Sequence, residues 1–360
     1  MKIENYLFMD IKKLQQFLDE NGLPKFRLGQ IQKAIFTDGV FSFGEITTLS
    51  KELREKMEKE LRLLSFEIEK VLTAKDGQSI KALLKLHSGD LIETVLISPK
   101  PGIWSACISC QVGCAMGCRF CATGKMGFKR DLTAEEITDQ ILFWKQYLKK
   151  NSSDLFENCE LKIENCDVNN IVYMGMGEPF NNWKEVSESI KILTDEKLFG
   201  FGSRSISVST SGIAEGIERM ANEFPQVNLA ISLHFASNEK RNRFMPINKK
   251  DNLENLRDAL KKYFTITKRK VFLEYIMLDG INDTALDAKL LADFIYSIGN
   301  THLLHMNLIR YNMTSEELKP SSKTRTQLFK QELEKHNINA TIRKSLGEEI
   351  EAACGQLAGK

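Results

Sequence analysis

A regular alternation of strand-like and helix-like segments begins at Ile103 and constrains the fold more than any other feature of the sequence. The strand candidates are rich in Val, Ile, Leu or Tyr and span residues 104–109, 170–175, 205–210, 227–233, 271–277 and 303–309. Helical patterns follow them at 133–149, 183–195, 213–223, 251–264, 284–297 and 324–336. Such a succession predicts a parallel sheet with helices outside. Six pairs are too few for a closed eight-fold barrel, so we expect an α/β fold built as a partial (β/α)6 barrel, with its chemistry at the carboxyl ends of the strands.

The first hundred residues follow a different pattern. Helical periodicity spans 10–22 and 49–63, and two short alternating runs, 81–86 and 93–97, are separated by the turn residues Ser88-Gly89-Asp90. We therefore expect four parts: a small helical domain that contacts RNA (1–75), a β-hairpin linker (76–100), the partial barrel (101–346) and a C-terminal tail (347–360).

Composition excludes several classes of protein. Fifty Lys and Arg against 48 Asp and Glu leave a formal charge of +2, and 42% of residues are hydrophobic, as in ordinary globular proteins. Bulk charge therefore gives no reason to expect nucleic-acid binding. No apolar run is long enough to span a membrane, and the first residues interleave charges where a secretory signal needs an apolar stretch. We expect a cytoplasmic protein that does not bind membranes.

The distribution of the cysteines along the chain is unusual. Five of the eight cysteines fall within 15 residues, at 107, 110, 114, 118 and 121. In a reducing compartment such crowding indicates a metal or catalytic site rather than a disulfide framework. Cys114, Cys118 and Cys121 form a CxxxCxxC motif after the first strand, and three such thiolates can hold a [4Fe–4S] cluster with its fourth iron open. A zinc site built from Cys107 and Cys110 with Cys118 and Cys121 is the alternative, but it leaves Cys114 unused.

Together with this motif, several other stretches resemble the radical S-adenosylmethionine (SAM) superfamily, and within it the RNA adenine methyltransferases of the RlmN/Cfr type. They are CISCQVGC (107–114), ATGKMGF (122–128), MGMGEP (174–179), SVSTSG (207–212), SLH (232–234), MPIN (245–248), NLIRYN (307–312) and AACGQL (352–357). The resemblance is weak over the first 75 residues and strong from Glu93 to Leu357.

The resemblance implies two groups of cofactor-binding residues. Cys114, Cys118 and Cys121 would bind one [4Fe–4S] cluster per chain. The residues implied for SAM lie at or near strand ends, which agrees with the expectation from the fold: Gly177, Glu178, Ser209, Ser232, Leu233, His234 and Asn312. Glu178 is suited to accept hydrogen bonds from the amino group of SAM.

The resemblance also implies how the methyl group moves. Cys354 would be methylated by one SAM molecule, and a second SAM, cleaved at the cluster, would supply a radical that activates the S-methyl group. Two SAM molecules are thus used per turnover. Cys107 would resolve the resulting protein–RNA crosslink through a transient disulfide with Cys354. Glu93 matches the carboxylate that acts as proton acceptor.

The implied substrate is an adenine of 23S ribosomal RNA at the peptidyl-transferase centre, and the adenine 3′ of the anticodon in transfer RNA is a second candidate. We expect a monomer that takes electrons from an external donor. Residues 240–270 contain eleven Lys and Arg against three acids, a local excess of +8 that would suit phosphate contacts. Four basic residues near the cluster motif are better placed for this: Arg119, Lys125, Lys129 and Arg130.

Some features leave alternatives open. Gln111-Val112-Gly113 and Glu178-Pro179 favour methylation at C2 of adenine, whereas Arg310-Tyr311-Asn312-Met313 favours C8. We favour C2, because the first two stretches flank the expected cofactors. Cys110 stands where the family usually has Ser or Thr, and residues 151–169, with Cys159 and Cys166, form an unusual insertion. A non-catalytic, zinc-stabilised RNA-binding protein remains the alternative from a different class.

Overall fold

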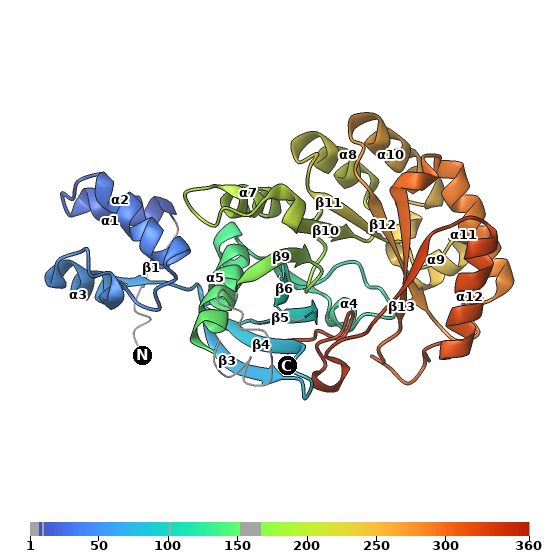
Figure 1. Ribbon diagram of the computed structural model, residues 1–360, viewed down its shortest axis with the longest axis horizontal. Helices are drawn as coiled ribbons and strands as arrows, with labels where there is room; N and C mark the ends of the chain where they lie inside the picture. The colour runs from blue at the N-terminus through green and yellow to red at the C-terminus, as the bar shows by residue number, and fades with distance from the viewer. Residues whose placement is uncertain (1–6, 9–10, 101, 152–166, 360) are drawn as a thin grey trace.

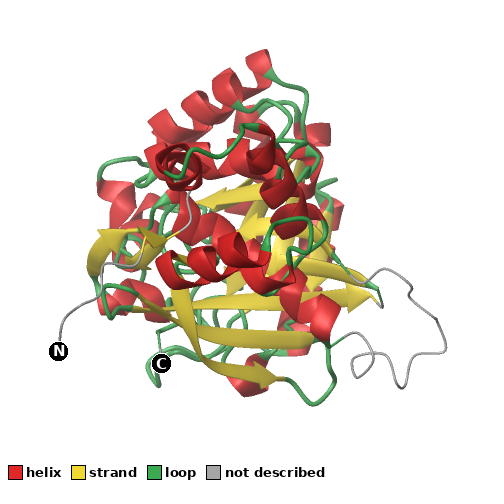
Figure 2. Ribbon diagram, turned by 90° about the vertical axis from the view of Figure 1, so that its left-hand side faces the viewer, coloured by secondary structure: helices red, strands yellow, loops and turns green. Residues whose placement is uncertain are grey.

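A ten-stranded sheet runs through the molecule in the order β14-β13-β12-β11-β10-β9-β6-β5-β4-β3 (Figures 1 and 2). The computed structural model describes residues 7–8, 11–100, 102–151 and 167–359. The six predicted strands are present and pair in parallel: β6 (Ile103–Cys107), β9 (Val168–Tyr173), β10 (Ile206–Thr210), β11 (Asn228–Ser232), β12 (Val271–Met277) and β13 (Leu304–Arg310). The end strands β14 and β3 do not pair with each other, so the barrel stays open.

The six predicted helices cover the outside of the parallel strands (Figure 1). They are α5 (Ala134–Lys150), α7 (Trp183–Thr194), α8 (Ala214–Glu223), α10 (Leu253–Ile266), α11 (Ala285–Ile298) and α12 (Lys323–Lys335). Helix α5 begins with a capping box between Thr133 and Glu136, and its apolar stripe is buried against the sheet at Ile137, Ile141 and Trp144. The partial-barrel prediction is thereby confirmed.

One parallel strand lies outside the prediction. Strand β14 (Ala340–Arg343) pairs with β13 and gives the sheet a seventh parallel strand. It is four residues long and mostly exposed, so it has no apolar run that local patterns could detect.

The other end of the sheet is antiparallel. The predicted hairpin is formed by β4 (Ser79–Leu86) and β5 (Leu91–Lys100), and β5 pairs with β6. Strand β3 (Phe66–Thr73) extends this part of the sheet, although it lies within residues 1–75, where we expected only helices. Most of its central residues are charged and all of them are exposed, so the sequence shows no clear alternation of apolar and polar residues.

The N-terminal part of the chain is otherwise helical, as expected. It contains α1 (Ile11–Glu20), α2 (Phe26–Gln32), a π-helical turn (Lys33–Thr37) and α3 (Lys51–Glu60), with the short parallel pair β1 (Leu7–Phe8) and β2 (Leu61–Arg62). Leu18, Ile31, Ile35 and Met57 are completely buried and form its core.

Short elements surround the cysteine motif. Strands β7 (Gln111–Gly113) and β8 (Phe128–Asp131) pair in antiparallel fashion, and α4 (Ala122–Met126) lies between them in the chain. Helix α9 (Asn238–Phe244) precedes a 3-10 turn at Pro246–Lys249. Further 3-10 turns are Phe43–Glu45, Ser203–Ser205, Thr301–Leu303 and Glu348–Ile350.

The chain after β14 returns across the open side of the barrel. The Lys344 ammonium donates to Gln78 (2.9 Å), and the Lys75 amide donates to the carboxylate of Glu349. In Figure 1 this last segment, in dark red, lies beside α4 and β4. The tail therefore connects the region after β14 to the antiparallel end of the sheet.

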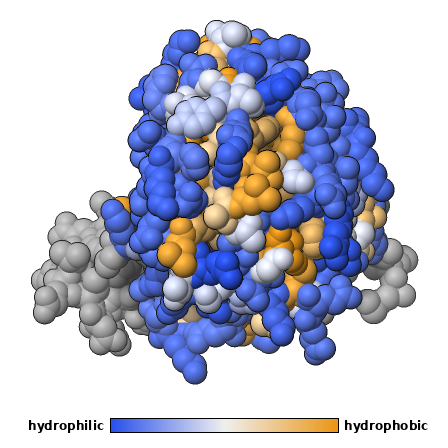
Figure 3. All heavy atoms as spheres, turned by 90° about the vertical axis from the view of Figure 1, so that its right-hand side faces the viewer, coloured by the Kyte–Doolittle hydropathy of each residue, from blue (hydrophilic) through white to orange (hydrophobic). Residues whose placement is uncertain are grey.

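One face of the molecule is mostly hydrophilic (Figure 3). Figure 3 shows the face on the right of Figure 1, where apolar side chains gather near the centre of a hydrophilic surface. Among the helices that the structure describes, none is long and apolar enough to cross a membrane. Cys159 and Cys166 lie outside the described residues.

Candidate active site

Glycines allow the CxxxCxxC loop to fold tightly between β7 and α4. Gly113 has a φ of +73°, and a Cβ there would lie 1.9 Å from the carbonyl oxygen of Gly127. That carbonyl accepts a hydrogen bond from the Cys114 amide (2.9 Å), which closes the base of the loop. A side chain at position 113 would prevent this closure.

The three thiols of the loop influence one another. Cys114 and Cys118 are buried and Cys121 is partly buried. Burial raises the pKa of Cys114 to about 12 and that of Cys118 well above its usual value, and the neighbouring Cys121 thiolate raises both further. Clustered buried thiols of this kind would ionise only beside a cation, as metal binding provides. The donor set thus fits an iron–sulfur cluster.

The geometry does not support the zinc alternative. Among the described residues, no three His, Cys, Asp or Glu side chains come together closely enough to hold one metal ion. Cys107, Cys110, Cys118 and Cys121 are therefore not arranged around a single ion. The same holds for Cys114, Cys118 and Cys121, which in a [4Fe–4S] cluster would each bind a different iron. Cys110 is buried instead beneath the MGMGEP turn, where burial and the nearby Glu178 charge raise the pKa of its thiol well above the usual value.

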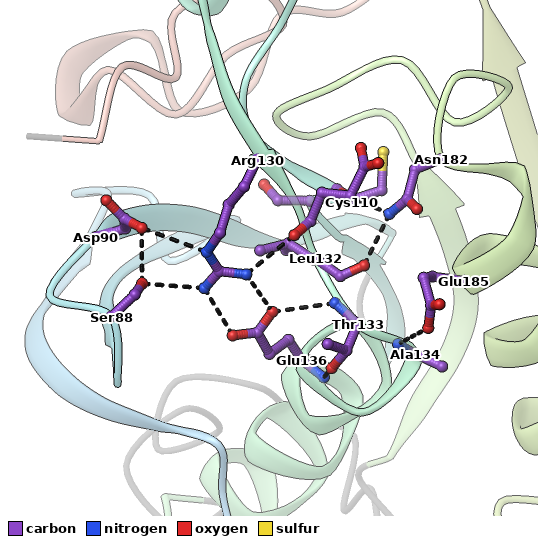
Figure 4. Close-up of polar contacts among 12 residues, drawn as sticks. Ser88, Asp90, Cys110, Arg130, Leu132, Thr133, Ala134, Glu136, Asn182 and Glu185 are labelled. Atoms are coloured by element: carbon purple, nitrogen blue, oxygen red, sulfur yellow. Dashed lines mark hydrogen bonds and ion pairs between the residues drawn. The ribbon is translucent and has the colours of Figure 1, made fainter.

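An ion-pair network fixes β8, and with it the end of the cysteine loop (Figure 4). The Arg130 guanidinium donates to both carboxylate oxygens of Glu136 (2.8 Å each), to Asp90 (3.3 Å) and to Ser88 (3.1 Å). Glu136 also completes the capping box of α5. The hydrogen bonds that Glu136 accepts raise the pKa of Arg130, and the hydrogen bond that Lys129 donates lowers the pKa of Asp90. Arg130 therefore ties β8 to both the β4–β5 turn and α5.

The turn after β9 packs tightly on the loop before the cysteine motif. Gly177 has a φ of +109°, and a Cβ there would lie 2.7 Å from the Cβ of Gln111 and 2.9 Å from the sulfur of Cys110. The Asn182 amide at the start of α7 donates to the carbonyls of Cys110 and Leu132 (2.8 Å each; Figure 4). These contacts hold the two predicted cofactor loops together.

Glu178 is buried at this turn. Its carboxylate accepts hydrogen bonds from the amides of Ser211 (2.7 Å) and Phe180 (3.1 Å). Burial raises the pKa of Glu178, and the hydrogen bonds from Ser211 oppose that shift. Because a carboxylate has about four acceptor sites, it retains capacity for a ligand ammonium group.

Polar side chains form a row across neighbouring strands. The hydroxyls of Ser209 on β10 and Ser232 on β11 are 3.5 Å apart. Ser232 is in register with Glu274 on β12, which is in register with Asn307 on β13, and Asn307 donates to Glu274 (2.9 Å). The Leu233 side chain is buried in the hydrophobic core, which leaves only its backbone for the expected contact with SAM.

His234 is held as a neutral ring. Its backbone has a φ of +56°, which is uncommon for residues other than glycine, and its Nδ1 accepts a hydrogen bond from the Ile276 amide (3.2 Å). Burial and the charge of Arg241 lower the pKa of His234 to about 3. With Nδ1 an acceptor, the proton lies on Nε2, the one N–H donor that the neutral ring can offer.

The C-terminal tail brings Cys354 to the cysteine loop. The Ala122 amide donates to the Gly355 carbonyl (2.8 Å), the Thr123 hydroxyl to the Leu357 carbonyl (2.6 Å) and the Asn312 amide group to the Cys354 carbonyl (3.1 Å). Asn312, which we expected to bind SAM, also accepts from Ser345 (2.6 Å), so its contacts in this structure are with the segment after β14.

The thiol of Cys354 has a raised pKa although the residue is exposed. The residue is exposed to solvent, yet protein surrounds its thiol; burial, followed by the Glu274 charge, raises its pKa to about 11, and Cys121 adds to the increase. Burial and the Cys354 charge raise the pKa of Cys107 to about 12. The tail thus places Cys354 near both Cys107 and Cys121. Cys107 and Cys354 are free thiols here, so the disulfide implied by the resemblance is not present.

Glu93 is more constrained than the sequence indicated. It is 1% exposed, and its Oε1 lies 2.9 Å from the ammonium of Lys81. Its Oε2 accepts hydrogen bonds from the backbone amides of Ala358 (2.7 Å) and Gly359 (3.2 Å). The expected proton acceptor therefore contacts the same tail that carries Cys354.

Arg241 is a site residue that sequence reasoning missed. We counted it in the basic stretch 240–270, but it is completely buried and cannot contact RNA. It donates to the carbonyls of Ser211 (2.5 Å) and Leu233 (3.3 Å) and to Asn248 (3.0 Å). Burial lowers its pKa to about 10. It joins the carboxyl ends of β10 and β11, a long-range role for which its neighbours in sequence give no signal.

The four basic residues near the motif also bind within the chain. Arg119 pairs with Glu317 (3.4 Å), Lys125 donates to the Thr314 carbonyl (3.1 Å), and Lys129 and Arg130 pair with Asp90. Any contact with RNA phosphates must compete with these partners.

Comparisons with known proteins agree with this arrangement. The model of the "Radical SAM superfamily" matches residues 108–290, and that of the "Ribosomal RNA large subunit methyltransferase N-terminal domain" matches residues 4–63. The chain is 42% identical to ribosomal RNA large subunit methyltransferase Cfr of Clostridium botulinum (strain Okra), over 96% of each chain. It is 40% identical to the probable dual-specificity RNA methyltransferase RlmN of Streptococcus suis, over 99% of this chain and 93% of that one.

A solved structure is similar throughout. A radical SAM methyltransferase from Sphaerobacter thermophilus superimposes with a TM-score of 0.88 at 35% identity, over 98% of both chains. Membership in this superfamily implies SAM and an iron–sulfur cluster as cofactors. The chain therefore belongs to the radical SAM superfamily and, within it, to the Cfr/RlmN-type ribosomal RNA methyltransferases.

Proposed function

We propose that this protein methylates a ring carbon of an adenine at the peptidyl-transferase centre of 23S ribosomal RNA, with the methyl group carried by Cys354. The observation that carries the proposal is the position of Cys354. Although it is remote in sequence, the contacts of the tail with Ala122, Thr123 and Asn312 hold it near Cys107 and Cys121. A tail thiol without a function would have no reason to be held there.

Other described side chains are proposed to bind the two cofactors. Cys114, Cys118 and Cys121 would hold the [4Fe–4S] cluster, whose chemistry when bound is the one-electron cleavage of SAM. Seven residues are proposed for SAM itself: Gly177, Glu178, Ser209, Ser232, Leu233, His234 and Asn312. Of these, Glu178 offers a buried carboxylate to an ammonium group, and His234 offers a neutral N–H donor.

The thiol chemistry requires a change in protonation. A thiol must lose its proton to accept a methyl group, and both Cys354 and Cys107 have raised pKa values in the protein alone. The positive charge of a bound sulfonium would favour the thiolate. Glu93 is the proposed acceptor of the proton that leaves the adenine ring carbon of the crosslink. The Cys107 thiolate would then attack the sulfur of Cys354, so that the S–S bond forms as the bond from that sulfur to the methylene carbon breaks, and this carbon takes up a proton to become the methyl group of the released base.

The favoured position is C2 of adenine, on the residues that flank the cofactor loops. C8 is the second candidate, favoured by the stretch from Arg310, the last residue of β13, to Met313. Mass spectrometry of nucleosides from 23S ribosomal RNA, from cells with and without the gene, distinguishes the two. We expect 2-methyladenosine that depends on the gene; 8-methyladenosine in its place would support the second candidate, and no change in either would overturn the proposal.

Transfer RNA is a proposed second substrate, and the same nucleoside analysis of purified transfer RNA tests it.

The cluster would receive electrons from an external donor. Protein purified anaerobically should contain iron and sulfide at about four each per chain. Stoichiometric zinc in their place, with no methyl group on Cys354, would instead support a non-catalytic RNA-binding protein.

A further inference from the structure

A single buried ion pair contacts both sides of the loop that carries Cys354. Lys81 on β4 and Glu93 on β5 lie on adjacent antiparallel strands, where Lys81 is in register with Val95, two residues after Glu93. Their charged atoms are 2.9 Å apart, and the side chains are only 4% and 1% exposed. Charges so deeply buried in a hairpin are costly unless each has further partners.

The tail supplies those partners. The Lys81 ammonium donates to the Glu351 carbonyl (3.3 Å), three residues before Cys354. The free oxygen of Glu93 accepts from the amides of Ala358 (2.7 Å) and Gly359 (3.2 Å), four and five residues after it. The loop from Glu351 to Gly359 is thus held at both ends by one pair of side chains on the hairpin.

An ion pair that served only the hairpin could take its further partners from the hairpin itself, whereas this one takes them from the tail. Well-packed apolar residues of similar size commonly stabilise a protein as much as a buried pair does, whereas charges specify which groups come together. Here the groups brought together are the hairpin and the two flanks of the Cys354 loop. The other lysine of β4 that pairs with a carboxylate is Lys85; its contact is with Glu69 on β3 (3.2 Å), and both side chains are exposed.

We propose that Lys81 is a positioning residue which, through Glu93 and the Glu351 carbonyl, holds the Cys354 loop beside Cys107 and Cys121. The inference deepens the proposed function and rests on it, because the position matters only if Cys354 carries the methyl group. Lys81 itself does not contact the thiol chemistry. It acts on where Cys354 lies and on how Glu93 is held.

Thiol alkylation of the anaerobically purified protein tests this without turnover. Trypsin releases residues 345–360 as a peptide in which Cys354 is the single cysteine, so the rate of its reaction with N-ethylmaleimide can be measured by mass spectrometry. In Lys81→Met the loop loses hydrogen bonds to charged groups, and we expect Cys354 to react at least about tenfold faster than in the wild type. The matched control Lys85→Met, on the same strand, should react at the wild-type rate.

The alkylation rate of the buried Cys110 distinguishes a change in the position of the Cys354 loop from a general loss of structure. If Lys81→Met increases the reactivity of Cys110 as much as that of Cys354, the lysine is merely structural and the proposal is wrong. An unchanged Cys354 rate in Lys81→Met also overturns it.

A second variant leaves the buried pair intact. Ala358→Pro removes the amide that donates to Glu93. We expect it to accelerate alkylation of Cys354 as well, and it decides the question if Lys81→Met does not fold. A wild-type rate in this variant overturns the proposal. Wild-type protein incubated with SAM gives the separate check: if Cys354 gains no methyl group, the proposed function fails, while the alkylation result stands on its own.

Discussion

The proposed cofactor-binding residues at the strand ends and the tail that carries Cys354 are held in place in opposite ways. Gly177 is closely packed against Gln111 and Cys110, and the buried side chains of Glu178 and His234 accept hydrogen bonds from backbone amides. Cys354 is exposed and depends on a few hydrogen bonds from α4, Asn312 and the β4–β5 hairpin. The proposed cofactor site is thus part of the sheet, whereas the proposed methyl carrier is attached to it. An attached carrier can be released and docked again at a small cost in free energy, which a residue within the sheet cannot.

The largest expected effect comes from removing the attached group itself. Cys354→Ala should abolish methylation of ribosomal RNA, since no thiol remains to carry the methyl group. Iron and sulfide content should equal that of the wild type, because the tail supplies no expected cluster ligand. Nucleoside mass spectrometry and metal analysis check the two halves; methylation that persists would reduce the tail to a structural element.

Gly177→Ala tests how rigid the strand-end site is. The new Cβ would lie within 2.9 Å of Gln111 and Cys110, at a φ that side chains avoid. We expect a loss of about 3 kcal/mol in the free energy of unfolding and much weaker SAM binding, by urea titration and calorimetry. Gly280→Ala is the matched control, because Gly280 also has positive φ but no atom within 4 Å of the added Cβ. Equal losses in both variants would mean that backbone strain alone, without crowding, explains the effect.

His234 gives the strand-end site a pH dependence on the acid side of neutrality. Its folded pKa of about 3 lies below the unfolded value of 6.5, so its contribution to stability is complete above pH 6.5 and is lost as the pH falls toward 3. His234→Asn tolerates the positive φ but does not titrate. Between pH 6 and 4 the wild type should lose up to about 1.4 kcal/mol per pH unit more than this variant in urea unfolding. Parallel curves would show that the ring is not buried as described.

The smallest expected effect concerns one hydrogen bond of the tail. Thr123→Val removes the donor to the Leu357 carbonyl while keeping the side-chain shape. A loss of about 1 kcal/mol in docking should reduce the methylation rate about fivefold and increase alkylation of Cys354 by a similar factor. Thr326→Val removes a comparable bond within α12, far along the chain from the tail, and should change neither. A large loss of activity in Thr123→Val would mean that the tail is as rigidly held as the sheet.

The elements that the sequence predicted correctly are those that local residue patterns specify. The six parallel strands and six helices were found because burial against a sheet imposes apolar periodicity. The capping box of α5 was found because its two residues lie three positions apart at the start of one helix. Strand β14 is short and exposed, and β3 carries charges on its outer positions, so neither produced that signal.

Long-range pairing is what the sequence could not reveal. In the sequence, nothing distinguishes Arg241 and Arg130 from arginines on the surface. Only the fold shows that Arg241 is buried between strand ends and that Arg130 is bound to Glu136 and Asp90. The motifs named the expected ligands and Cys354 through resemblance. The contacts of Glu93 and Asn312 with the tail join segments more than forty residues apart, and no spacing rule predicts them.

The segment after β14 has a consequence for the sheet as a whole. A sheet that does not close has two ends that can move apart, and here residues 344–359 join them, from Lys344 against Gln78 to Gly359 against Glu93. Any change in the curvature of the sheet must therefore stretch or release this segment. The location of one reactive sulfur is in this way coupled to the shape of all ten strands.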